Sequence, residues 1–347
     1  MIGTQILEGQ GLGNRLFCYV TARCAALEKN AEFGLMGADI LRKSLSGKNG
    51  EPYMDLWMGK EASPEDFSQR YEEKEERIFT GTCGHDLEHG CYVAGADEGV
   101  LKAADGTLLM GNLQAECYFE KYKEEIRKWL KVKPEYETFA YSRDNLCVLN
   151  MRGGEYTGEP ALYLRKKYWT DAMKHMKQIR PDMEFMIVTD DVEAAHKLLP
   201  GIEAHHFTPD KDYVVVKNAK YLIISNSSFA FFPAYTSETV KKVIAPKYWA
   251  RHNVSDGYWA SEQNIYSGFM YLDRKGKLFS AEACKKELEE YKKVSAKFQN
   301  RKQKPDGLKK KWMKLEAAFF YKWYYAVRAG RSLKRRLKCI LGKEENK

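Results

Sequence analysis

The chain of 347 residues is long enough to form two domains, each with its own hydrophobic core. Hydrophobic residues make up 44% of it and aromatic residues 13%, which excludes a generally disordered protein. The net charge of +9 is unevenly spread, because residues 296–347 carry 17 Lys/Arg and only 4 Asp/Glu. The rest of the chain is therefore slightly acidic, which argues against broad nucleic-acid contact by the body of the protein.

The cellular compartment is indicated by what the sequence lacks. The first residues hold neither a basic n-region nor an apolar h-region, so no signal peptide is predicted. No uninterrupted apolar stretch reaches the length of a transmembrane helix. The eight cysteines have no paired spacing, and Cys147, inside an apolar run, is typical of a reduced core residue. A reducing cytoplasm is the expected compartment.

Residues 1–140 are expected to form an N-terminal α/β domain. A short strand at 5–7 leads into a glycine-rich loop at 9–14, and a helix follows with apolar residues at helical spacing. Residues 41–105 are irregular and charged, and we assign them to variable loops. The remaining elements expected here are a strand at 108–110 and an amphipathic helix at 118–132.

Residues 141–275 are expected to form a second α/β domain. Short apolar runs alternate with helical patterns, which indicates a doubly wound parallel sheet with its ligands at the carboxyl ends of the strands. The expected strands are 146–149, 185–188, 221–224 and 243–245, and the expected helices are 166–179, 192–199, 214–219 and 229–235. Residues 276–347 remain as a helical, basic and aromatic tail.

Polar side chains follow three of these strands. Asn150 and Arg152 follow the first, Asp190 and Asp191 the second, and Ser225 to Ser228 the third. Because the carboxyl ends of parallel strands lie at one edge of a sheet, we expect these residues to share a site.

Two of these groups suit a phosphate. The hydroxyls and backbone N–H groups of residues 225–229, added to the positive end of a helix dipole, favour an anion, although a simple helix N-cap is the alternative. Arg152 is a fixed cation with five donors, suited to a diphosphate, and Gly153-Gly154 would open space around it. The alternative is an ion pair of Arg152 with Glu155 or a neighbouring carboxylate.

Two other motifs indicate different ligands. Gly9-x-Gly11 resembles the start of a dinucleotide fingerprint, but Asn14 stands where the third glycine belongs, so nicotinamide or flavin binding is disfavoured. The segment from Cys83 to Cys91 holds two histidines that suggest zinc, but glycines bracket it, and a polar loop is the default interpretation.

The C-terminal tail interleaves basic and aromatic residues. Lys309-Lys310-Lys311 precedes a cluster of Trp, Phe and Tyr side chains at residues 312–325, and a second basic run follows at 331–336. This pattern favours an interfacial helix on an anionic membrane. RNA binding would use the same residues, and packing on the body is the third alternative.

Taken together, these segments resemble glycosyltransferase family 11, the α-1,2-fucosyltransferases, and more distantly the α-1,6- and protein O-fucosyltransferases. The family's opening signature, Gly-Gly-Leu-Gly-Asn-Gln-x-Phe-x-Tyr, is similar to residues 10–19, and its His-x-Arg-Arg-Gly-Asp-Tyr motif is similar to residues 150–156. The other matching segments are 111–119, 189–191, the span from Asp212 to Ser228, and 245–249.

The resemblance implies a GT-B fold, in which two Rossmann-like domains face each other across a cleft. The first domain, residues 1–140, would lie on the acceptor side, and the second, residues 141–275, would bind a GDP-sugar. It implies that Arg152 and Ser228, with Ser227, hold the β-phosphate. It also implies that Asp212 reads the guanine amino and imino protons and that Asn14 approaches the donor phosphates from the other domain. The complete expected donor site is Gly11, Gly13, Asn14, Asn150, Arg152, Asp190, Asp191, Asp212, Ser227, Ser228 and Phe229, with Arg152 and Asn14 as its catalytic residues.

Enzymes of this kind invert the anomeric centre and need no metal or other cofactor, since arginine and hydroxyl groups stabilise the departing GDP. The chain departs from the family motifs at four positions: Arg15 replaces Gln, Asn150 replaces His, Gly153 replaces the second Arg, and Glu155 replaces Asp. Arg15 is a candidate to replace the lost cation.

The sequence therefore predicts a metal-independent glycosyltransferase that moves fucose from GDP-fucose to a glycan or lipid-linked oligosaccharide. An α-1,2 linkage and a role in bacterial surface polysaccharide synthesis are expected, with the protein peripheral on the inner face of the cell membrane. One alternative is the same fold with another nucleotide sugar. The other is a non-catalytic protein that binds a sugar nucleotide or a nucleic acid.

Overall fold

The computed structural model describes residues 1–74, 77–78, 91–92, 96–159, 162–248, 264–300 and 304–344. It divides into two compact units. The first comprises Met1–Lys74 and Ala94–Glu290, and the second comprises Glu75–Val93 and Tyr291–Lys347. The first unit holds both of the larger sheets and every residue of the expected donor site.

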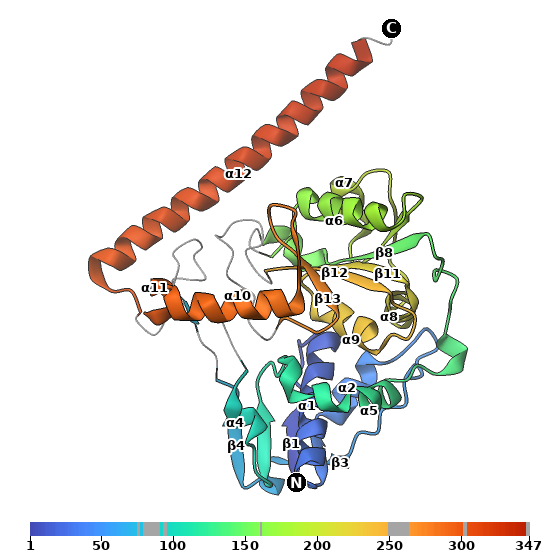
Figure 1. The fold of residues 1–347 in the computed structure, drawn as a ribbon, viewed down its shortest axis with the longest axis vertical. Coiled ribbons are helices and arrows are strands. Elements are labelled where there is room, and N and C mark those ends of the chain that lie inside the picture. Colours follow the sequence, from blue (N-terminus) through green and yellow to red (C-terminus); the bar gives the residue numbers. More distant parts are fainter. Residues whose placement is uncertain are drawn as a thin grey trace. The chain divides into compact units, whose positions relative to one another are not determined.

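The N-terminal part of the first unit is built on a five-stranded parallel sheet with the order β3-β2-β1-β7-β4 (Figure 1). Its central strands are apolar and buried, whereas the two edge strands are polar, as suits exposed sheet edges. The strands are β1 (Ile2–Gln5), β2 (Phe33–Met36), β3 (Lys60–Glu61), β4 (Gln69–Glu72) and β7 (Thr107–Met110).

Helix α1 (Leu12–Glu28) packs on this sheet, and Leu16 and Val20 are among its buried residues. Phe17, also buried, stacks on Phe231 of the C-terminal part of this unit. The other helices around the sheet are short. They are α2 (Ala38–Ser44), α4 (Glu98–Leu101) and α5 (Lys123–Trp129).

The C-terminal part of the first unit is built on a seven-stranded sheet with the order β10-β9-β8-β11-β12-β13-β14. All neighbouring strands are parallel except β14, which pairs antiparallel with β13. The strands are β8 (Leu146–Met151), β9 (Glu184–Thr189), β10 (Glu203–His205), β11 (Tyr221–Ile224), β12 (Lys242–Pro246), β13 (Phe269–Leu272) and β14 (Leu278–Ser280).

Helices connect these strands as parallel crossovers require. They are α6 (Lys166–Ile179), α7 (Val192–Leu198), α8 (Pro209–Asn218) and α9 (Phe231–Thr236), and α10 (Ala281–Val294) follows the last strand. Helix α6 buries Trp169, Ala172 and Met176 against the apolar residues of β8, β9 and β11. This core fixes where the carboxyl ends of the strands lie.

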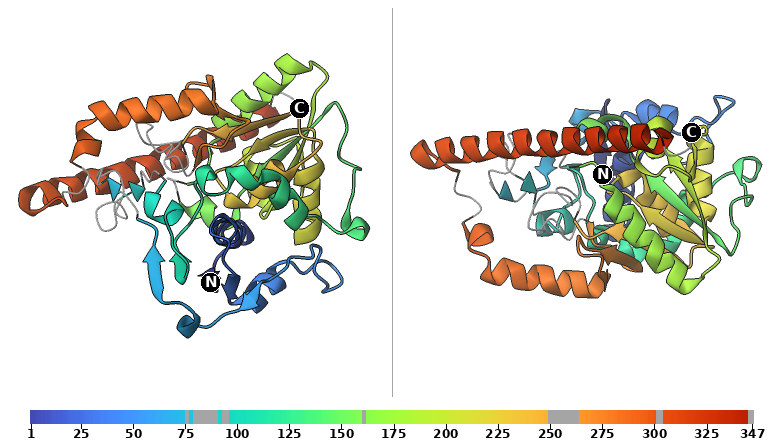
Figure 2. Two further views of the ribbon diagram at one scale, coloured as in Figure 1. Left: turned by 60° about the horizontal axis from the view of Figure 1, so that its bottom comes forward. Right: turned by 90° about the horizontal axis from the view of Figure 1, so that it is seen from above.

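The second unit contains α12 (Gly307–Glu344), one long helix that is plain in both ribbon figures (Figure 2). Its other elements are the antiparallel pair β5 (Arg77–Ile78) and β6 (Cys91–Tyr92), and α11 (Ala296–Gln299). Within the part of the chain that is described, every helix is too short or too polar to cross a bilayer.

The alternating strands and helices expected after residue 141 are confirmed: the predicted helix 166–179 and strand 221–224 have the observed bounds. The helix expected at 214–219 begins earlier, at Pro209, a residue that favours the first turn. As a result, Asp212 lies on a helix and not in a loop.

The expectations for the first 140 residues need three corrections. The first strand is Ile2–Gln5 and not 5–7, because the N–H of Leu7 donates to the Gln10 side chain and turns the chain. The helix expected at 118–132 is shorter and runs from Lys123 to Trp129. Two 3₁₀ turns, separated at Phe119, precede it. The region 41–105 contributes both edge strands of the sheet, whose polar sequences carry no strand pattern.

Candidate functional site

Residues that follow β8 and β11 lie at the point where the order of the second sheet reverses. The chain passes from β8 outward through β9 to β10, then returns to β11 on the other side of β8. The backbone N–H of Ser225 donates to the Asn150 carbonyl at 2.9 Å, and that of Arg152 donates to the Ser225 hydroxyl at 3.3 Å. In open α/β sheets, ligands usually bind at such a reversal of strand order, outside the carboxyl ends of the strands.

The first sheet has an equivalent reversal between β1 and β7. Asn14 lies in the helix that follows β1, and Gln114 lies in the loop that follows β7. The Nε2 group of Gln114 donates to the Oδ1 atom of Asn14 at 3.1 Å. This bond joins the two connections that leave the strand ends on either side of the reversal.

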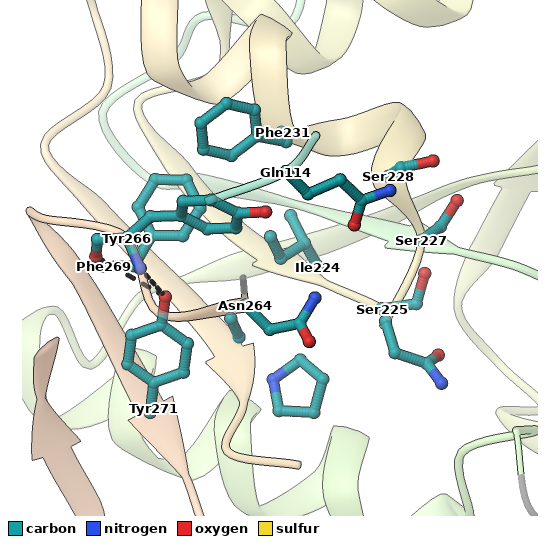
Figure 3. Close-up of a pocket in the computed structure, with 13 residues that line it drawn as sticks. Gln114, Ile224, Ser225, Ser227, Ser228, Phe231, Asn264, Tyr266, Phe269 and Tyr271 are labelled. Atoms are coloured by element: carbon teal, nitrogen blue, oxygen red, sulfur yellow. Dashed lines mark hydrogen bonds between the residues drawn. The ribbon is translucent and has the colours of Figure 1, made fainter. Parts of the chain in front are cut away.

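Residues from both sheets line one cavity of about 40 Å³. Gln114 from the first sheet and Ser225 to Ser228 from the second form part of its wall, and the carboxamide of Gln114 points toward Ser227 and Ser228 (Figure 3). The remaining wall is mostly apolar and consists of Ile224, Phe231, Ala245, Pro246, Asn264, Tyr266, Phe269 and Tyr271. A volume of this size holds a few water molecules or one substituent of a ligand, but not a whole nucleotide sugar.

Arg152 makes two ion pairs. Its guanidinium lies 2.9 Å from the Glu155 carboxylate and 2.7 Å from that of Asp190. The pairing that we gave as the alternative for Arg152 is therefore present. Burial opposes the charge, but the two carboxylates outweigh it and raise the pKa of the guanidinium. The three groups together carry a net charge of −1, so the exposed Glu155 competes with a diphosphate for Arg152.

The glycines after Arg152 do not open the space that the sequence suggested. A Cβ built on Gly153 would lie 2.5 Å from the Cβ of Asp191, so Asp191 already fills that side. The N–H of Gly153 donates to Asp190 at 2.7 Å, and Gly154 has a positive φ of 45°. An arginine at position 153, as in the family motif, would not fit without movement of this loop.

Asp190 and Asp191 have different roles in the structure. Asp190 holds the Arg152 side chain and the backbone of Gly153. Asp191 is the N-cap of α7, and its side chain accepts from the N–H of Ala194 at 2.9 Å. Asp190 therefore positions the Arg152 loop, whereas Asp191 stabilises a helix end.

Asp212 is only 6% exposed, and both of its oxygens are engaged. One accepts from the backbone N–H of Phe207 at 3.0 Å, and the other lies 3.0 Å from Nδ1 of His206. Burial raises the pKa of Asp212, although the contacts with Phe207 and His206 act in the opposite direction. A guanine base would have to replace these partners.

The serine segment begins a short helical stretch. Ser227 caps a 3₁₀ turn, Ser228–Ala230, by accepting from the N–H of Phe229 at 3.3 Å, and the six-residue helix α9 follows. The N-cap interpretation is therefore confirmed. The dipole of so short a helix adds little, so hydroxyls and backbone N–H groups are what this segment offers an anion. Phe229 packs edge-on against Tyr213.

The expected residues near the start of α1, namely Gly11, Gly13 and Arg15, have different surroundings. Gly13 packs on Ser228, whereas Gly11 has no neighbour that a Cβ would meet within 4 Å. Arg15 donates to the carbonyls of Ile40 and Leu7, so its guanidinium is directed to backbone groups of the first sheet. Among the expected donor residues, only Ser227 and Ser228 line the cavity.

The other eleven cavity residues are absent from the expected donor site, and among those outside the serine segment Gln114, Asn264 and Tyr266 carry polar side chains. Gln114 lies in the segment 111–119 that resembles the family, so that resemblance contained a signal for it. The segment from Cys83 to Cys91 lies outside the residues whose side chains are described. Among those that are described, no three His, Cys, Asp or Glu side chains are grouped to hold a metal ion.

No protein-family model matches the chain. The chain is 26% identical over 161 residues to an alpha-1,2-colitosyltransferase from Escherichia coli, a match that covers 40% of this chain and 55% of that protein. The chain thus spans about half the length of the curated relative. This similarity confirms the resemblance to fucosyltransferase-like glycosyltransferases that the motifs indicated.

Solved structures of two glycosyltransferases give weaker matches. Fucosyltransferase NodZ from Bradyrhizobium has a TM-score of 0.40 at 12% identity, covering 80% of this chain and 97% of that one. NodZ alpha-1,6-fucosyltransferase soaked with GDP-fucose has a TM-score of 0.39 at 13% identity, covering 74% and 97%. The dodecameric glycosyltransferase TibC from enterotoxigenic E. coli has a TM-score of 0.34 at 10% identity, covering 96% and 77%. These scores are too low to establish a shared fold.

Proposed function

We propose that this protein is an inverting glycosyltransferase that moves fucose from GDP-fucose to a hydroxyl of a glycan acceptor. The observation that carries the proposal is the meeting of two strand-end sites: Gln114 from the first sheet and Ser225 to Ser228 from the second line one cavity. The sequence similarity to an alpha-1,2-colitosyltransferase supports the reaction class, because that protein also transfers a sugar. We extend the proposal to an α-1,2 linkage, a GT-B arrangement of two domains, and a surface polysaccharide as product.

In the proposed reaction the oxygen of an acceptor hydroxyl attacks the anomeric carbon of the donor. The bond from that carbon to the β-phosphate oxygen breaks, and GDP leaves with the electron pair. The hydroxyl proton passes to a base or to solvent. Negative charge grows on the departing diphosphate, and groups that are already aimed at it lower the barrier.

Arg152 is the proposed cation for this charge, and Ser227 and Ser228 are the proposed hydroxyl donors. Their support is geometric: Arg152 is tied through its backbone to Ser225, three residues from Ser228. Asn14 is proposed to join them, because it directly follows Gly13, which packs on Ser228. Since a guanidinium and hydroxyls supply the charge stabilisation, we propose that no metal ion is required, and EDTA should leave the transfer rate unchanged.

Calorimetric titration with GDP tests the proposal. We expect Arg152→Ala to weaken GDP binding about 10- to 100-fold, the effect of one lost charge-assisted contact. The matched control is Arg143→Ala, since Arg143 pairs with Glu184 at the start of β9 and has no place in the site. An intact protein that binds no GDP, or an Arg152→Ala variant that transfers sugar at the normal rate, would contradict the proposal.

One observation favours a nucleotide sugar other than GDP-fucose as the donor substrate: both Asp212 oxygens already have hydrogen-bond partners. If these bonds and the burial of Asp212 keep guanine from its remaining lone pairs, the carboxylate does not read guanine and the base of the donor is open. A thermal-shift comparison of GDP with UDP decides between the two: greater stabilisation by GDP supports the fucosyl donor, and greater stabilisation by UDP rejects it.

We also propose that α12 holds the protein on an anionic membrane, where lipid-linked oligosaccharides reside. Five exposed apolar residues recur at spacings of three and four, which places them on one face of the helix. They are Leu308, Trp312, Leu315, Phe319 and Trp323. Exposed lysines at 309–311, 314 and 322 lie on the same helix. This combination suits an interfacial helix beside anionic headgroups.

A further inference from the structure

A buried carboxylate accepts a hydrogen bond from the loop that carries Gln114. Glu73, which follows edge strand β4, is only 6% exposed. Its Oε2 atom accepts from the backbone N–H of Leu113 at 2.8 Å, and its Oε1 atom accepts from the Tyr118 hydroxyl at 2.9 Å. Burying an ionised group is costly unless it is bonded in this way. Glu73 thus fixes the residue that directly precedes Gln114.

The loop has a backbone that few residues adopt without support. Leu113 has a φ of +51°, which is strained for a residue with a side chain. Gly111 has a φ of +145°, and a Cβ there would lie 2.5 Å from the Cβ of Glu73. The Thr21 hydroxyl donates to the carbonyl of Leu113 at 2.9 Å. Both backbone groups of Leu113 are therefore held by buried side chains, and such strain is concentrated at functional sites.

The consequence is a fixed direction for the next residue. Gln114 leaves this loop, donates through Nε2 to Oδ1 of Asn14, and lines the cavity beside Ser227 and Ser228. Because the Oδ1 atom of Asn14 takes part in this bond, the group that Asn14 presents on its other side is Nδ2, a donor. A hydrogen-bond donor such as this N–H₂ group suits an anionic group of a ligand, whereas the carbonyl of Gln114, a hydrogen-bond acceptor, suits a hydroxyl of a ligand.

We propose that Gln114 is a further ligand-contacting residue and that Glu73 is the positioning residue that aims it. In this arrangement Gln114 holds the Asn14 amide so that its N–H groups face the diphosphate of the donor. The inference rests on the proposed function and adds two residues and one orientation to it.

Asn14→Asp tests whether the Asn14 side chain faces the diphosphate. An aspartate still accepts the Gln114 hydrogen bond, but its second oxygen replaces the N–H₂ group and repels an anion. We expect GDP binding by calorimetry to be about 10- to 100-fold weaker in Asn14→Asp than in Asn14→Ala. Equal affinities in the two variants would overturn the orientation.

The link from Glu73 to Gln114 is tested by non-additivity. We expect Gln114→Ala and Glu73→Gln each to weaken GDP binding about three- to tenfold, and the double variant to be no weaker than the weaker single variant. Melting temperatures confirm that each variant is folded. Two variants are the matched controls. Gln69→Ala removes a hydrogen bond from a side-chain amide to the Thr107 hydroxyl on the same sheet. Glu137→Gln alters a carboxylate that accepts hydrogen bonds from Lys217 and Asn218.

If the losses of GDP affinity in the two single variants multiply in the double variant, Glu73 stabilises the fold without aiming Gln114. Equal losses in the two controls would also overturn the inference. Its failure is distinct from that of the proposed function: an intact protein that binds no GDP removes both, whereas an intact protein that binds GDP and is insensitive at Gln114 removes this inference alone.

Discussion

Gly13 lies directly against the backbone of Ser228, although the two residues follow strands of different sheets. A Cβ built on Gly13 would lie 2.3 Å from the carbonyl carbon of Ser228 and 2.4 Å from its oxygen. Only a glycine allows α1 to approach the serine segment this closely. The contact brings the beginning of α1, with Asn14, to the strand-end site of the second sheet.

This contact gives the first prediction. Gly13→Ala should lower the free energy of unfolding by about 1–3 kcal/mol, because backbone atoms of Ser228 cannot move aside as a flexible side chain can. GDP binding should weaken as well. Chemical denaturation followed by circular dichroism measures the loss.

Gly11→Ala is the matched control. Gly11 has an ordinary φ of −69° at the N-cap of α1, and a Cβ there meets nothing within 4 Å. The cost should stay within about 1 kcal/mol, the difference between glycine and alanine at a cap. Similar losses in the two variants would show that the contact with Ser228 is not what position 13 requires.

A second prediction follows from the carboxylates around Arg152. Glu155 is exposed and pairs with the guanidinium that we assign to the diphosphate. Glu155→Gln removes this competitor and should tighten GDP binding by up to about fivefold, since an exposed ion pair is worth at most about 1 kcal/mol. Calorimetry measures the change.

The control for Glu155→Gln is Glu193→Gln, which makes the same charge change at an exposed pair with Lys197 on α7. It should leave GDP affinity unchanged. If Glu155→Gln weakens binding instead, Glu155 itself contacts the ligand and Arg152 is not the group it restrains.

A third prediction concerns pH. Burial raises the pKa of Asp212 above that of the unfolded chain, so the folded protein binds this proton more tightly. The resulting stabilisation is fully present below the unfolded pKa of about 3.9 and is lost as pH rises through the folded value. Asp212→Asn removes this loss because the amide stays neutral.

We therefore expect Asp212→Asn to be at least as stable as the unmodified protein at neutral pH, with a flatter dependence of stability on pH. GDP binding should nevertheless fall if Asp212 reads guanine. Urea titrations from below pH ~3.9 up to neutral pH measure the stability of the variant, and calorimetry measures its GDP binding. A variant destabilised at neutral pH would mean that the bonds to Phe207 and His206 outweigh the cost of burial.

The fourth prediction concerns the exposed apolar face of α12. Combined substitution of Trp312, Phe319 and Trp323 by alanine should reduce binding to anionic vesicles at least tenfold, because these side chains are 72%, 72% and 52% exposed and would insert at the interface. Co-sedimentation measures it, and added salt should weaken the remaining binding.

Phe139→Ala is the control for the tail, since Phe139 is a single exposed aromatic residue of the first unit. It should not change vesicle binding. GDP binding should be retained in the triple variant. Undiminished vesicle binding would refute the role of this helix face, and retention on RNA in place of vesicles would favour the nucleic-acid alternative.

Local patterns predicted four buried strands of the second sheet, β8, β9, β11 and β12, and its amphipathic helices, but they did not predict β10, β13 or β14. The run Tyr221–Ile224 and the helix Lys166–Ile179 carry their own signals in hydrophobicity and spacing. The edge strands β3 and β4 carry none, since polar edge residues read as loops. The predicted split into domains at residues 140 and 275 stays a prediction, with both sheets in one compact unit.

The sequence by itself determined which strands end in polar residues, and so named Arg152, Asp190 and the serine segment. Tertiary structure decided what each of them contacts. Asp190 pairs with Arg152, Asp191 caps a helix, and Glu73 reaches Leu113 across forty residues. Such partners depend on which strands lie side by side, and strand order is set by long-range packing, which no local pattern encodes.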